Sequence, residues 1–376
     1  MIRILQVVGG LNRAGVETWL MHVLRNIDRD RFRMDFLVHG QEKYAYEDEA
    51  TKLGSRVIRC LHPNRPWSYF RNFGRILSEH GPYDVVHSHV HHFSGIAMRL
   101  AHRAHVPVRI AHSHVDTRIV DSKSQLPRGA YLGLMGSWIE AHATLGLCAS
   151  DMAKESLFPH GKDFAFPIST VYYSVDLTPF ALDIDREQVK RELNIPSDAV
   201  VFGHVGRFEH QKNHIFFSEI ASEILKIEPR AWFLMIGDGE LRQSVTRRFE
   251  ALRVGHRTSF IGVSNSVPRL MLGAMDVLVF PSIYEGLPVV LIEIQAAGLA
   301  CVISANISPE GDVVPELIQR LSIEDSSSVW ARVAVNSALG ARSISKSDAL
   351  QRVEASRFGP LRSVRKVEEV YSRHCT

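Results

Sequence analysis

The sequence has few cysteines and no long apolar run. Its four cysteines are scattered without paired spacing, which disfavours a disulfide framework; they are Cys60, Cys148, Cys301 and Cys375. Three of them enter or follow apolar runs, which predicts buried thiols in a reducing compartment. No apolar stretch approaches the ~20 residues that a transmembrane helix needs. The opening MIRILQVVGG is too short and too strand-like for a signal peptide, so we expect a cytoplasmic protein.

The G-x-G-x-x-G fingerprint of dinucleotide-binding proteins is also absent. The first apolar run is followed by VVGGLNRAGVETWL, and the second ends in FLVHG, with His39 where an acidic residue would bind ribose. An NAD-dependent enzyme is therefore disfavoured. The net charge is +3, with the positive excess in the first 165 residues, which suggests an anionic surface or substrate for that half. We expect no nucleic-acid partner.

Short β-branched runs alternate with amphipathic stretches along the chain. This alternation breaks near residues 170–180 and then resumes. Strand–helix–strand order predicts parallel pairing, so we expect an α/β protein with two doubly wound, Rossmann-like domains that face a central cleft. We place the domains at 1–172 and 173–357, and a final amphipathic helix at 358–376 that packs back toward the first domain.

The stretch FPSIYEGLPVVLIEIQAAG joins a strand, a turn and a helix, and it carries two carboxylates. Pro288 suits a first helical position, and the N–H groups of Gly286 and Leu287 would then face an anion at the helix N-terminus. Glu285 precedes this anion site, and Glu293 lies beyond it in the helix. The spacing suits a nucleotide sugar, with Glu285 on the sugar and Glu293 on the ribose. Alternatively, Glu285 only caps the helix and Glu293 is exposed.

Two cations follow an earlier strand of the second half, in GHVGRFEHQKNH. Arg207 and Lys212 straddle this loop and could clamp a diphosphate, neutralising it as a leaving group. They could also be solvated surface cations. In the first half, the glycine-rich turn before VETWL allows Gly15 to approach a phosphate closely.

Histidines gather at two strand ends, in VVHSHVHHFSG and RIAHSHVDTR. No familiar zinc spacing is present, so we expect structural or site-lining histidines and no metal. His114 is the best candidate to hydrogen-bond the transferred sugar or the acceptor. Two D-x-D pairs, at 28–30 and 183–185, follow no strand, so a metal–diphosphate role is not expected for them.

Together these motifs resemble the family-4-type glycosyltransferases of the GT-B fold, above all the bacterial enzymes of capsule, exopolysaccharide and lipopolysaccharide assembly. NRAGVET, GRFEHQKNH, IGDGE, the PS-x-x-EG-x-P stretch and VEEVYSR fall in the family's order across nearly the whole chain. The resemblance implies a retaining, metal-independent transfer from a nucleotide diphosphate sugar, with UDP favoured, to a lipid-linked or oligosaccharide acceptor. The donor phosphate would help to deprotonate the acceptor. A hexosyl- or N-acetylhexosaminyl-transferase is expected.

The resemblance also implies roles for single residues, in agreement with the roles above. Arg207 and Lys212 hold the diphosphate; Glu285, Gly286 and Leu287 hold sugar and phosphate; Glu293 holds ribose. Gly15 approaches the phosphate, and His114 lies beside the sugar. Two departures stand out: the first turn has one glycine, in AGVE, and the usual Asn-Gly-Val-Asp after the interdomain strand reads YSVD here.

The acceptor side is expected in the basic half. The segment HPNRPWSYFRNFGR, residues 62–75, interleaves arginines with aromatics, as in segments that lie on an anionic bilayer, so we predict peripheral association with the cytoplasmic face of the inner membrane. Alternatively, its aromatics are core residues. Two other functions stay open: a catalytically silent GT-B subunit that binds sugar nucleotide or partners an active enzyme, and a sugar-nucleotide epimerase.

Overall fold

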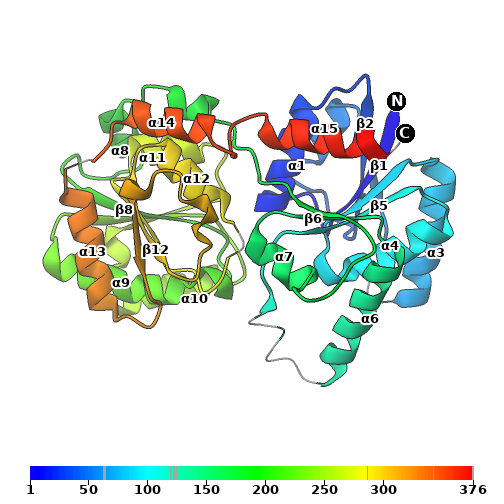
Figure 1. The fold of residues 1–376 in the computed structure, drawn as a ribbon. Helices are drawn as coiled ribbons and strands as arrows, with labels where there is room; N and C mark the ends of the chain where they lie inside the picture. The colour runs from blue at the N-terminus through cyan, green and yellow to red at the C-terminus, as the bar shows by residue number, and fades with distance from the viewer. Residues whose placement is uncertain (62–64, 119–120, 122–125, 286, 342, 375–376) are drawn as a thin grey trace. The chain divides into compact units, whose positions relative to one another are not determined.

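The computed structural model describes residues 1–61, 65–118, 121, 126–285, 287–341 and 343–374. They form two compact units, Met1–Ser174 with Leu361–Thr376, and Val175–Pro360. Each unit holds one parallel sheet with helices on both of its faces (Figure 1), so the predicted α/β class with two doubly wound sheets is confirmed.

In the first unit, the described residues form a seven-stranded parallel sheet in the order β3-β2-β1-β4-β5-β6-β7. Helices α1 and α15 cover one face, and α3, α4 and α6 cover the other (Figure 1). The strands are β1 (Ile2–Val7), β2 (Phe32–Val38), β3 (Val57–Arg59), β4 (Val85–Ser88), β5 (Val108–Ser113), β6 (Leu145–Cys148) and β7 (Ile168–Thr170). The helices are α1 (Gly15–Asn26), α2 (Glu47–Lys52), α3 (Pro66–His80), α4 (Ser94–Arg103), α6 (Leu126–His142), α7 (Asp151–Leu157) and α15 (Arg362–His374).

The second unit repeats this arrangement with the strand order β10-β9-β8-β11-β12-β13 over its described residues. Helices α8, α11, α12 and α14 lie on one face, and α9, α10 and α13 on the other (Figure 1). The strands are β8 (Val200–Val205), β9 (Ala231–Ile236), β10 (Thr258–Gly262), β11 (Val277–Phe280), β12 (Ala300–Ser304) and β13 (Ile318–Leu321). The helices are α8 (Arg186–Glu192), α9 (His214–Ile227), α10 (Arg242–Ala251), α11 (Val267–Gly273), α12 (Val289–Ala296), α13 (Ser327–Leu339) and α14 (Lys346–Ala355).

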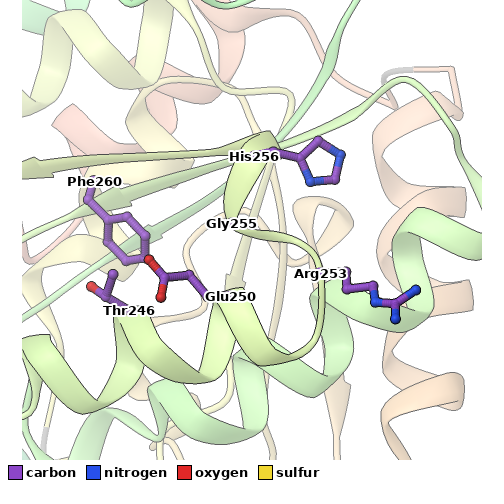
Figure 2. A pocket seen from close by; sticks show the side chains of 6 residues that line it. All are labelled: Thr246, Glu250, Arg253, Gly255, His256 and Phe260. Carbon is purple, nitrogen blue, oxygen red and sulfur yellow. The ribbon is translucent and has the colours of Figure 1, made fainter.

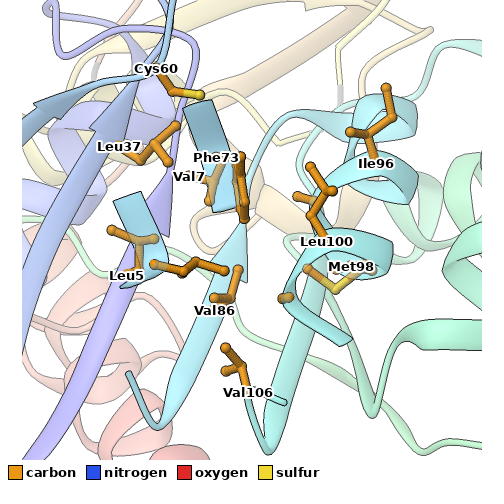
Figure 3. Close-up of a cluster of buried hydrophobic side chains, with 14 of the residues drawn as sticks. Leu5, Val7, Leu37, Cys60, Phe73, Val86, Ile96, Met98, Leu100 and Val106 are labelled. Atoms are coloured by element: carbon orange, nitrogen blue, oxygen red, sulfur yellow. The ribbon is translucent and has the colours of Figure 1, made fainter. Parts of the chain in front are cut away.

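Strand alternation gives the two faces of the first sheet opposite chemistry. Leu5, Val7 and Val86 point into an apolar core under α3 and α4 (Figure 3). Gln6, between Leu5 and Val7, and His87, next to Val86, are fully buried polar residues and belong to the other face. One face is therefore an ordinary hydrophobic core, and the other buries a polar cluster.

In both sheets the strand order reverses once. It reverses between β1 and β4 in the first unit and between β8 and β11 in the second. In open parallel sheets, ligands bind outside the carboxyl ends of the strands at this switch point. The loops that follow β8 and β11 carry Arg207, Lys212 and Glu285, so the fold of the second unit brings these residues to its switch point.

The cysteines, Pro288 and the lengths of the helices bear on the expectations from the sequence. Cys60, Cys148 and Cys301 are buried and free, as predicted, whereas Cys375 lies outside the described residues. The prediction that Pro288 opens its helix was wrong by one residue, because Pro288 is the extended residue before α12. No helix in the described ranges has the length and apolarity required to cross a bilayer.

Candidate functional site

The loops after β8 and β11 are tied together by hydrogen bonds. The N–H of Ile283 donates to the carbonyl of Gln211 at 2.9 Å, and Nδ2 of Asn213 donates to the carbonyl of Pro281 at 3.1 Å. Asn213 adopts the left-handed conformation, with φ of 56°, directly before α9. Asparagine tolerates this conformation better than most residues. These bonds fix the loop from which Lys212 projects.

Lys212 and Glu285 form a buried ion pair at this place. Nζ of Lys212 lies 2.5 Å from Oε1 of Glu285, and the two side chains are only 17% and 8% exposed. Nε2 of Gln211 donates to Oε2 of Glu285 at 3.1 Å, and Nζ of Lys212 also lies 4.6 Å from the ring centroid of Phe280. Both carboxylate oxygens are thus engaged. The alternative that Lys212 is a solvated surface cation and Glu285 merely a helix cap does not fit this geometry.

The glycines of the GDG turn after β9 are required by close backbone contacts. A Cβ at Gly237, whose φ is +135°, would lie 2.0 Å from the carbonyl oxygen of Gly206. A Cβ at Gly239 would lie 2.7 Å from the carbonyl oxygen of Phe208. The turn therefore packs directly on the loop that carries Arg207 and Lys212, and it supports that loop sterically.

The other predicted residues of the second-unit site make no hydrogen bond or ion pair with the Lys212–Glu285 pair in the part of the chain that the structure describes. Arg207 is exposed, and its guanidinium donates to Glu209 at 2.8 Å rather than joining the Lys212–Glu285 pair. Leu287 is buried just before α12. Gly286 lies outside the described residues, so its proposed backbone contact to phosphate stays a prediction.

Glu293 lies on α12 between the buried side chains of Ile292 and Ile294. Removal from solvent raises the pKa of its carboxyl from 4.5 to about 7. Glu293 itself is partly buried, so the alternative of an exposed Glu293 is wrong. Two residues on, the buried side chain of Gln295 donates to the carbonyl of Gly311 at 2.8 Å and accepts from the N–H of Val314 at 2.7 Å. It anchors the loop after β12 to the helix that carries Glu293.

In the first unit, four histidines meet on the polar face of the sheet. His87 and His112 join through Nε2 and Nδ1 at 3.0 Å, and His89 and His114 join through Nδ1 and Nε2 at 2.8 Å. His114 directly follows β5 and is half-buried; it also bonds the hydroxyl of Tyr173 through Nδ1. Burial lowers the pKa of all four imidazoles, so they are neutral near pH 7.

Three of these histidines have the spacing of a metal site. Ring nitrogens of His87, His89 and His112 lie within 4.8 Å of one another, a spacing that could hold an ion. However, both ring nitrogens of His87 and both of His89 are already hydrogen-bonded, and only Nε2 of His112 has no partner among the described residues. A metal would have to displace these bonds, and no carboxylate belongs to the trio to offset its charge.

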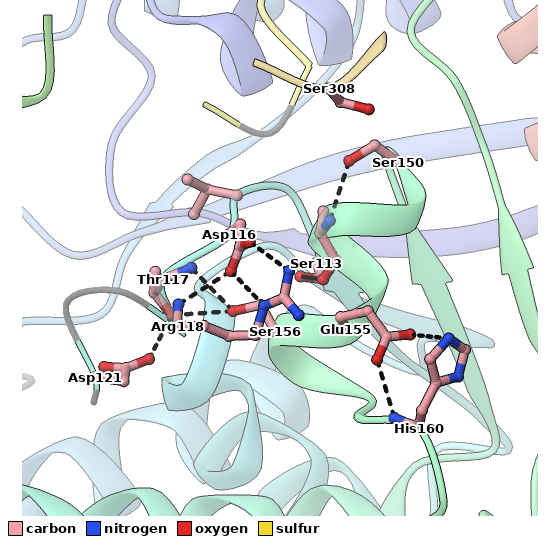
Figure 4. Close-up of polar contacts among 12 residues, drawn as sticks. Ser113, Asp116, Thr117, Arg118, Asp121, Ser150, Glu155, Ser156, His160 and Ser308 are labelled. Atoms are coloured by element: carbon pink, nitrogen blue, oxygen red, sulfur yellow. Dashed lines mark hydrogen bonds and ion pairs between the residues drawn. The ribbon is translucent and has the colours of Figure 1, made fainter. Parts of the chain in front are cut away.

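Gly15 and the loop after His114 complete the first-unit candidates. Gly15 begins α1, and a Cβ there would meet nothing within 4 Å, so its surroundings are open. The loop after His114 is held by ionic and hydroxyl contacts (Figure 4). Arg118 pairs with Asp116 at 2.7 Å, and the N–H of Thr117 donates to Ser156 of α7 at 3.0 Å. Residues 116–118, which follow His114, are therefore held in place by these contacts.

The D-x-D pairs have structural roles. Asp185 accepts the N–H of Gln188 and caps α8, and Oδ1 of Asp28 accepts the N–H of Asp30. A separate pocket of the second unit, lined by Thr246, Glu250 and Phe260 among others, lies between α10 and β10 (Figure 2). Its residues include Gly255 and His256, which precede β10. It therefore reaches the amino-terminal end of that strand, and none of the candidate residues lines it.

Sequence reasoning missed several polar residues of both sites. The sequence patterns single out neither Gln211 and Gln295 of the second unit nor Gln6 and Tyr371 of the first. The repeated His-Ser-His, at 87–89 and 112–114, was a usable signal for the last two. Residues two apart on adjacent parallel strands share a face, so the four histidines had to meet and needed polar partners there.

Comparisons with known proteins identify the family of the chain. A glycosyl transferase 4-like domain matches residues 14–161, and the group 1 glycosyl transferases match residues 185–339. EpsF of Bacillus subtilis (strain 168), which is described as a glycosyltransferase, is 32% identical over 347 residues, 90% of this chain and 88% of EpsF. The chain belongs to the group 1 glycosyltransferases. The resemblance noted in the sequence is thereby confirmed.

This glycosyltransferase is also similar to a second curated protein and to a solved structure. An Escherichia coli UDP-Gal:α-D-GlcNAc-diphosphoundecaprenol α-1,3-galactosyltransferase is 31% identical over 231 residues, 59% of this chain and 58% of that protein. The crystal structure of Anabaena HepE in complex with UDP and glucose has a TM-score of 0.82 at 16% identity and covers 99% of this chain and all of HepE. The latter likeness shows the GT-B fold.

Proposed function

We propose that this glycosyltransferase moves a hexosyl or N-acetylhexosaminyl group from a UDP-sugar to a lipid-linked or oligosaccharide acceptor, with retention of configuration and without a metal ion. The observation that carries the proposal is the buried Lys212–Glu285 pair at the β8/β11 switch point. The UDP and glucose bound by HepE and the diphosphoundecaprenol acceptor of the E. coli relative support the choice of donor and acceptor class.

Lys212 has the charge and position to bind a diphosphate. A nucleotide diphosphate would offer its ammonium group a second anionic partner beside Glu285. Arg207, held by only one exposed contact to Glu209, can turn toward the same anion at little cost. Leu287, with Gly286, would donate backbone N–H groups to phosphate, Glu285 would bind the sugar, and Glu293 would accept the ribose hydroxyls. From the first unit, we assign Gly15 to the phosphate and His114 to the sugar.

The proposed chemistry needs no protein nucleophile. The acceptor hydroxyl attacks the anomeric carbon on the face from which the diphosphate leaves, and the bond from that carbon to the phosphate oxygen breaks. The proton of the acceptor passes to a phosphate oxygen of the departing nucleoside diphosphate. Lys212 and Arg207 stabilise the charge that develops on this leaving group. Removing one hydrogen-bond donor that stabilises developing negative charge typically costs about 10²–10³ in kcat.

Binding calorimetry with UDP, GDP, ADP and their sugar conjugates, in chelator and then with Mg²⁺, tests the donor site. We expect UDP to bind in chelator, and Lys212→Ala to weaken it. Lys226→Ala is the matched control, because it removes an exposed lysine of the same unit whose partner is Glu223. Binding of no nucleotide, or only with Mg²⁺, would overturn the proposal. Turnover of UDP-sugar only when a polyprenyl-diphosphate sugar is present would separate a transferase from an epimerase and from a silent subunit.

We also propose that the first unit binds the cytoplasmic membrane surface through α3. Tyr69 and Phe73 are fully buried in the core, but Trp67 is 86% exposed and Arg71 is exposed beside it. Residues of α3 and α4 line a groove of about 750 Å³, and Arg71 and Arg103 lie among them. An exposed indole among arginines suits an anionic bilayer. Residues 62–64 of the predicted segment lie outside the described ranges.

Co-sedimentation with vesicles tests this association. The protein should bind vesicles that contain phosphatidylglycerol at low salt and not those of phosphatidylcholine alone. If it binds neither, the membrane proposal fails, and the transferase proposal is unaffected.

A further inference from the structure

A path of hydrogen bonds crosses the polar face of the first sheet and includes His114. Nε2 of Gln6 donates to the hydroxyl of Tyr371 at 2.9 Å, and Oε1 of Gln6 bonds Nε2 of His89 at 2.8 Å. Nδ1 of His89 bonds Nε2 of His114 at 2.8 Å, and Nδ1 of His114 bonds the hydroxyl of Tyr173. Both ring nitrogens of His114 are therefore engaged.

The chemistry of an amide gives this path a direction. An amide oxygen can only accept, so Nε2 of His89 must carry a hydrogen and donate it to Gln6. Because burial keeps these imidazoles neutral, Nδ1 of His89 has no hydrogen and must accept from Nε2 of His114. Nδ1 of His114 is then an acceptor, and the hydroxyl of Tyr173 is its donor.

The structure places Nε2 of Gln6 toward Tyr371 and Oε1 toward His89. Gln6 is fully buried on the central strand β1, and Tyr371 belongs to α15. The hydroxyl of Tyr371 also bonds Nδ1 of His87 at 2.8 Å, so it is held from two sides. Turning the amide of Gln6 over would reverse every donor and acceptor from Gln6 to Tyr173.

We propose that Gln6 is a positioning residue that fixes the tautomer of His114 through His89, so that Nδ1 of His114 is a hydrogen-bond acceptor for a sugar hydroxyl. This inference rests on the proposed function, since it takes His114 as the residue beside the sugar. Tyr173, the next-to-last residue of the first unit's main segment, donates to this nitrogen when no sugar does. The sugar hydroxyl must therefore act as a donor, and an O-methyl or deoxy analogue at that position loses the bond.

Nitrogen NMR of ¹⁵N-histidine-labelled protein at pH 7.5 tests the tautomers directly, because two-bond ¹H–¹⁵N correlations distinguish Nδ1–H from Nε2–H imidazole. Signals are assigned by their loss in His89→Gln and His114→Gln. We expect the Nε2–H form at both residues in the parent protein. In Gln6→Met, which keeps the side-chain length and removes the amide, both should shift to an average of the two forms.

Tyr371→Phe and Tyr173→Phe complete the test. Tyr371→Phe frees the amide of Gln6 to turn and should also mix the tautomers; it decides the matter if Gln6→Met does not fold. Tyr173→Phe should leave His114 in the Nε2–H form, because the direction is set from Gln6. A Nδ1–H form of His114 in the parent, or tautomers that respond to Tyr173→Phe and not to the other two changes, would overturn the proposal.

Kinetics separate this inference from the proposed function. Gln6→Met should lower kcat/KM for the sugar donor about tenfold, equal to about 1.4 kcal/mol. Its affinity for UDP, which has no sugar to bind His114, should equal that of the parent. An unchanged kcat/KM together with mixed tautomers would refute the role of His114 Nδ1. If the parent binds no nucleotide, the proposed function fails, while the NMR result still decides the tautomer.

Discussion

The carboxyl of Glu293 should make the second unit less stable as pH rises. Its pKa in the folded protein is about 7, whereas the pKa of a solvent-exposed glutamate is 4.5, because burial disfavours the charged form. The folded state therefore keeps a proton that the unfolded chain releases between these values. For an acid with a raised pKa, stability is highest below about pH 4.5 and falls as pH rises through 7.

The size of this effect follows from the shift. A change from 4.5 to about 7 corresponds to about 3 kcal/mol once both states are ionised, at 1.36 kcal/mol per unit. Most of it, about 2–3 kcal/mol, develops between pH 5 and pH 8. Glu293→Gln does not titrate, and any cost of burying its amide is the same at every pH. The difference in unfolding free energy between variant and parent should therefore grow in the variant's favour by that amount.

Urea unfolding at pH 5, 6, 7 and 8 measures this difference. Because the protein has two units, pulse-labelling hydrogen exchange read by peptide should assign a separate midpoint to each. Glu354→Gln on α14 is the matched control, since Glu354 is an exposed acid of the same unit. Parallel pH profiles for the parent and Glu293→Gln would refute the reasoning. In calorimetry, the parent should bind UDP more weakly at pH 6 than at pH 8, because hydroxyl groups donate better to the carboxylate.

Three further predictions concern single contacts. Lys212→Ala should destabilise the second unit by about 3 kcal/mol in urea unfolding, because it leaves Glu285 buried without its cation. Adding Glu285→Gln to Lys212→Ala should recover much of that loss. Equal stability of the single and the double variant would contradict this. Gly237→Ala should lower Tm and UDP affinity, since its Cβ would lie 2.0 Å from a backbone oxygen. Gly133→Ala on α6 is the control: its Cβ would meet no atom within 4 Å, so Tm should stay unchanged or rise. Trp67→Ser should abolish vesicle binding and leave Tm unchanged, because its side chain is 86% exposed; retained binding would exclude α3 as the contact.

Strand periodicity predicted most of the fold, and the misses have a common cause. Both undetected strands, β7 and β13, lie at sheet edges and are three and four residues long. Ile168–Thr170 is half-buried throughout, and Ile318–Leu321 includes Gln319 and Arg320, so neither shows the apolar run that marks a central strand. A short edge strand without such a run leaves little signal in the sequence.

The sequence predicted which charged residues belong to the candidate site, but not that Lys212 and Glu285 pair directly. That Lys212 and Glu285 both follow strands was visible, since the strands themselves were. Their direct contact depends on β8 and β11 being adjacent although they are separated by two strands in the chain. Likewise, the link from Gln6 to Tyr371 joins residues 365 positions apart. Such links follow from strand order and from the way helix α15 docks on the sheet; a local pattern predicts the helix but not its partners.

The two acids of the PS-x-x-EG-x-P stretch differ in what ligand binding can change. Glu285 already has a cation and an amide as partners, so a sugar hydroxyl adds to or replaces contacts that satisfy it. The carboxylate of Glu293 makes no hydrogen bond or ion pair to any residue that the structure describes, and the partial burial of the residue raises its pKa. Ribose hydroxyls would provide the missing donors. Nucleotide binding should therefore lower the pKa of Glu293 and release a proton near pH 7. The heat of UDP binding should then depend on the ionisation enthalpy of the buffer. Glu293→Gln should remove this dependence.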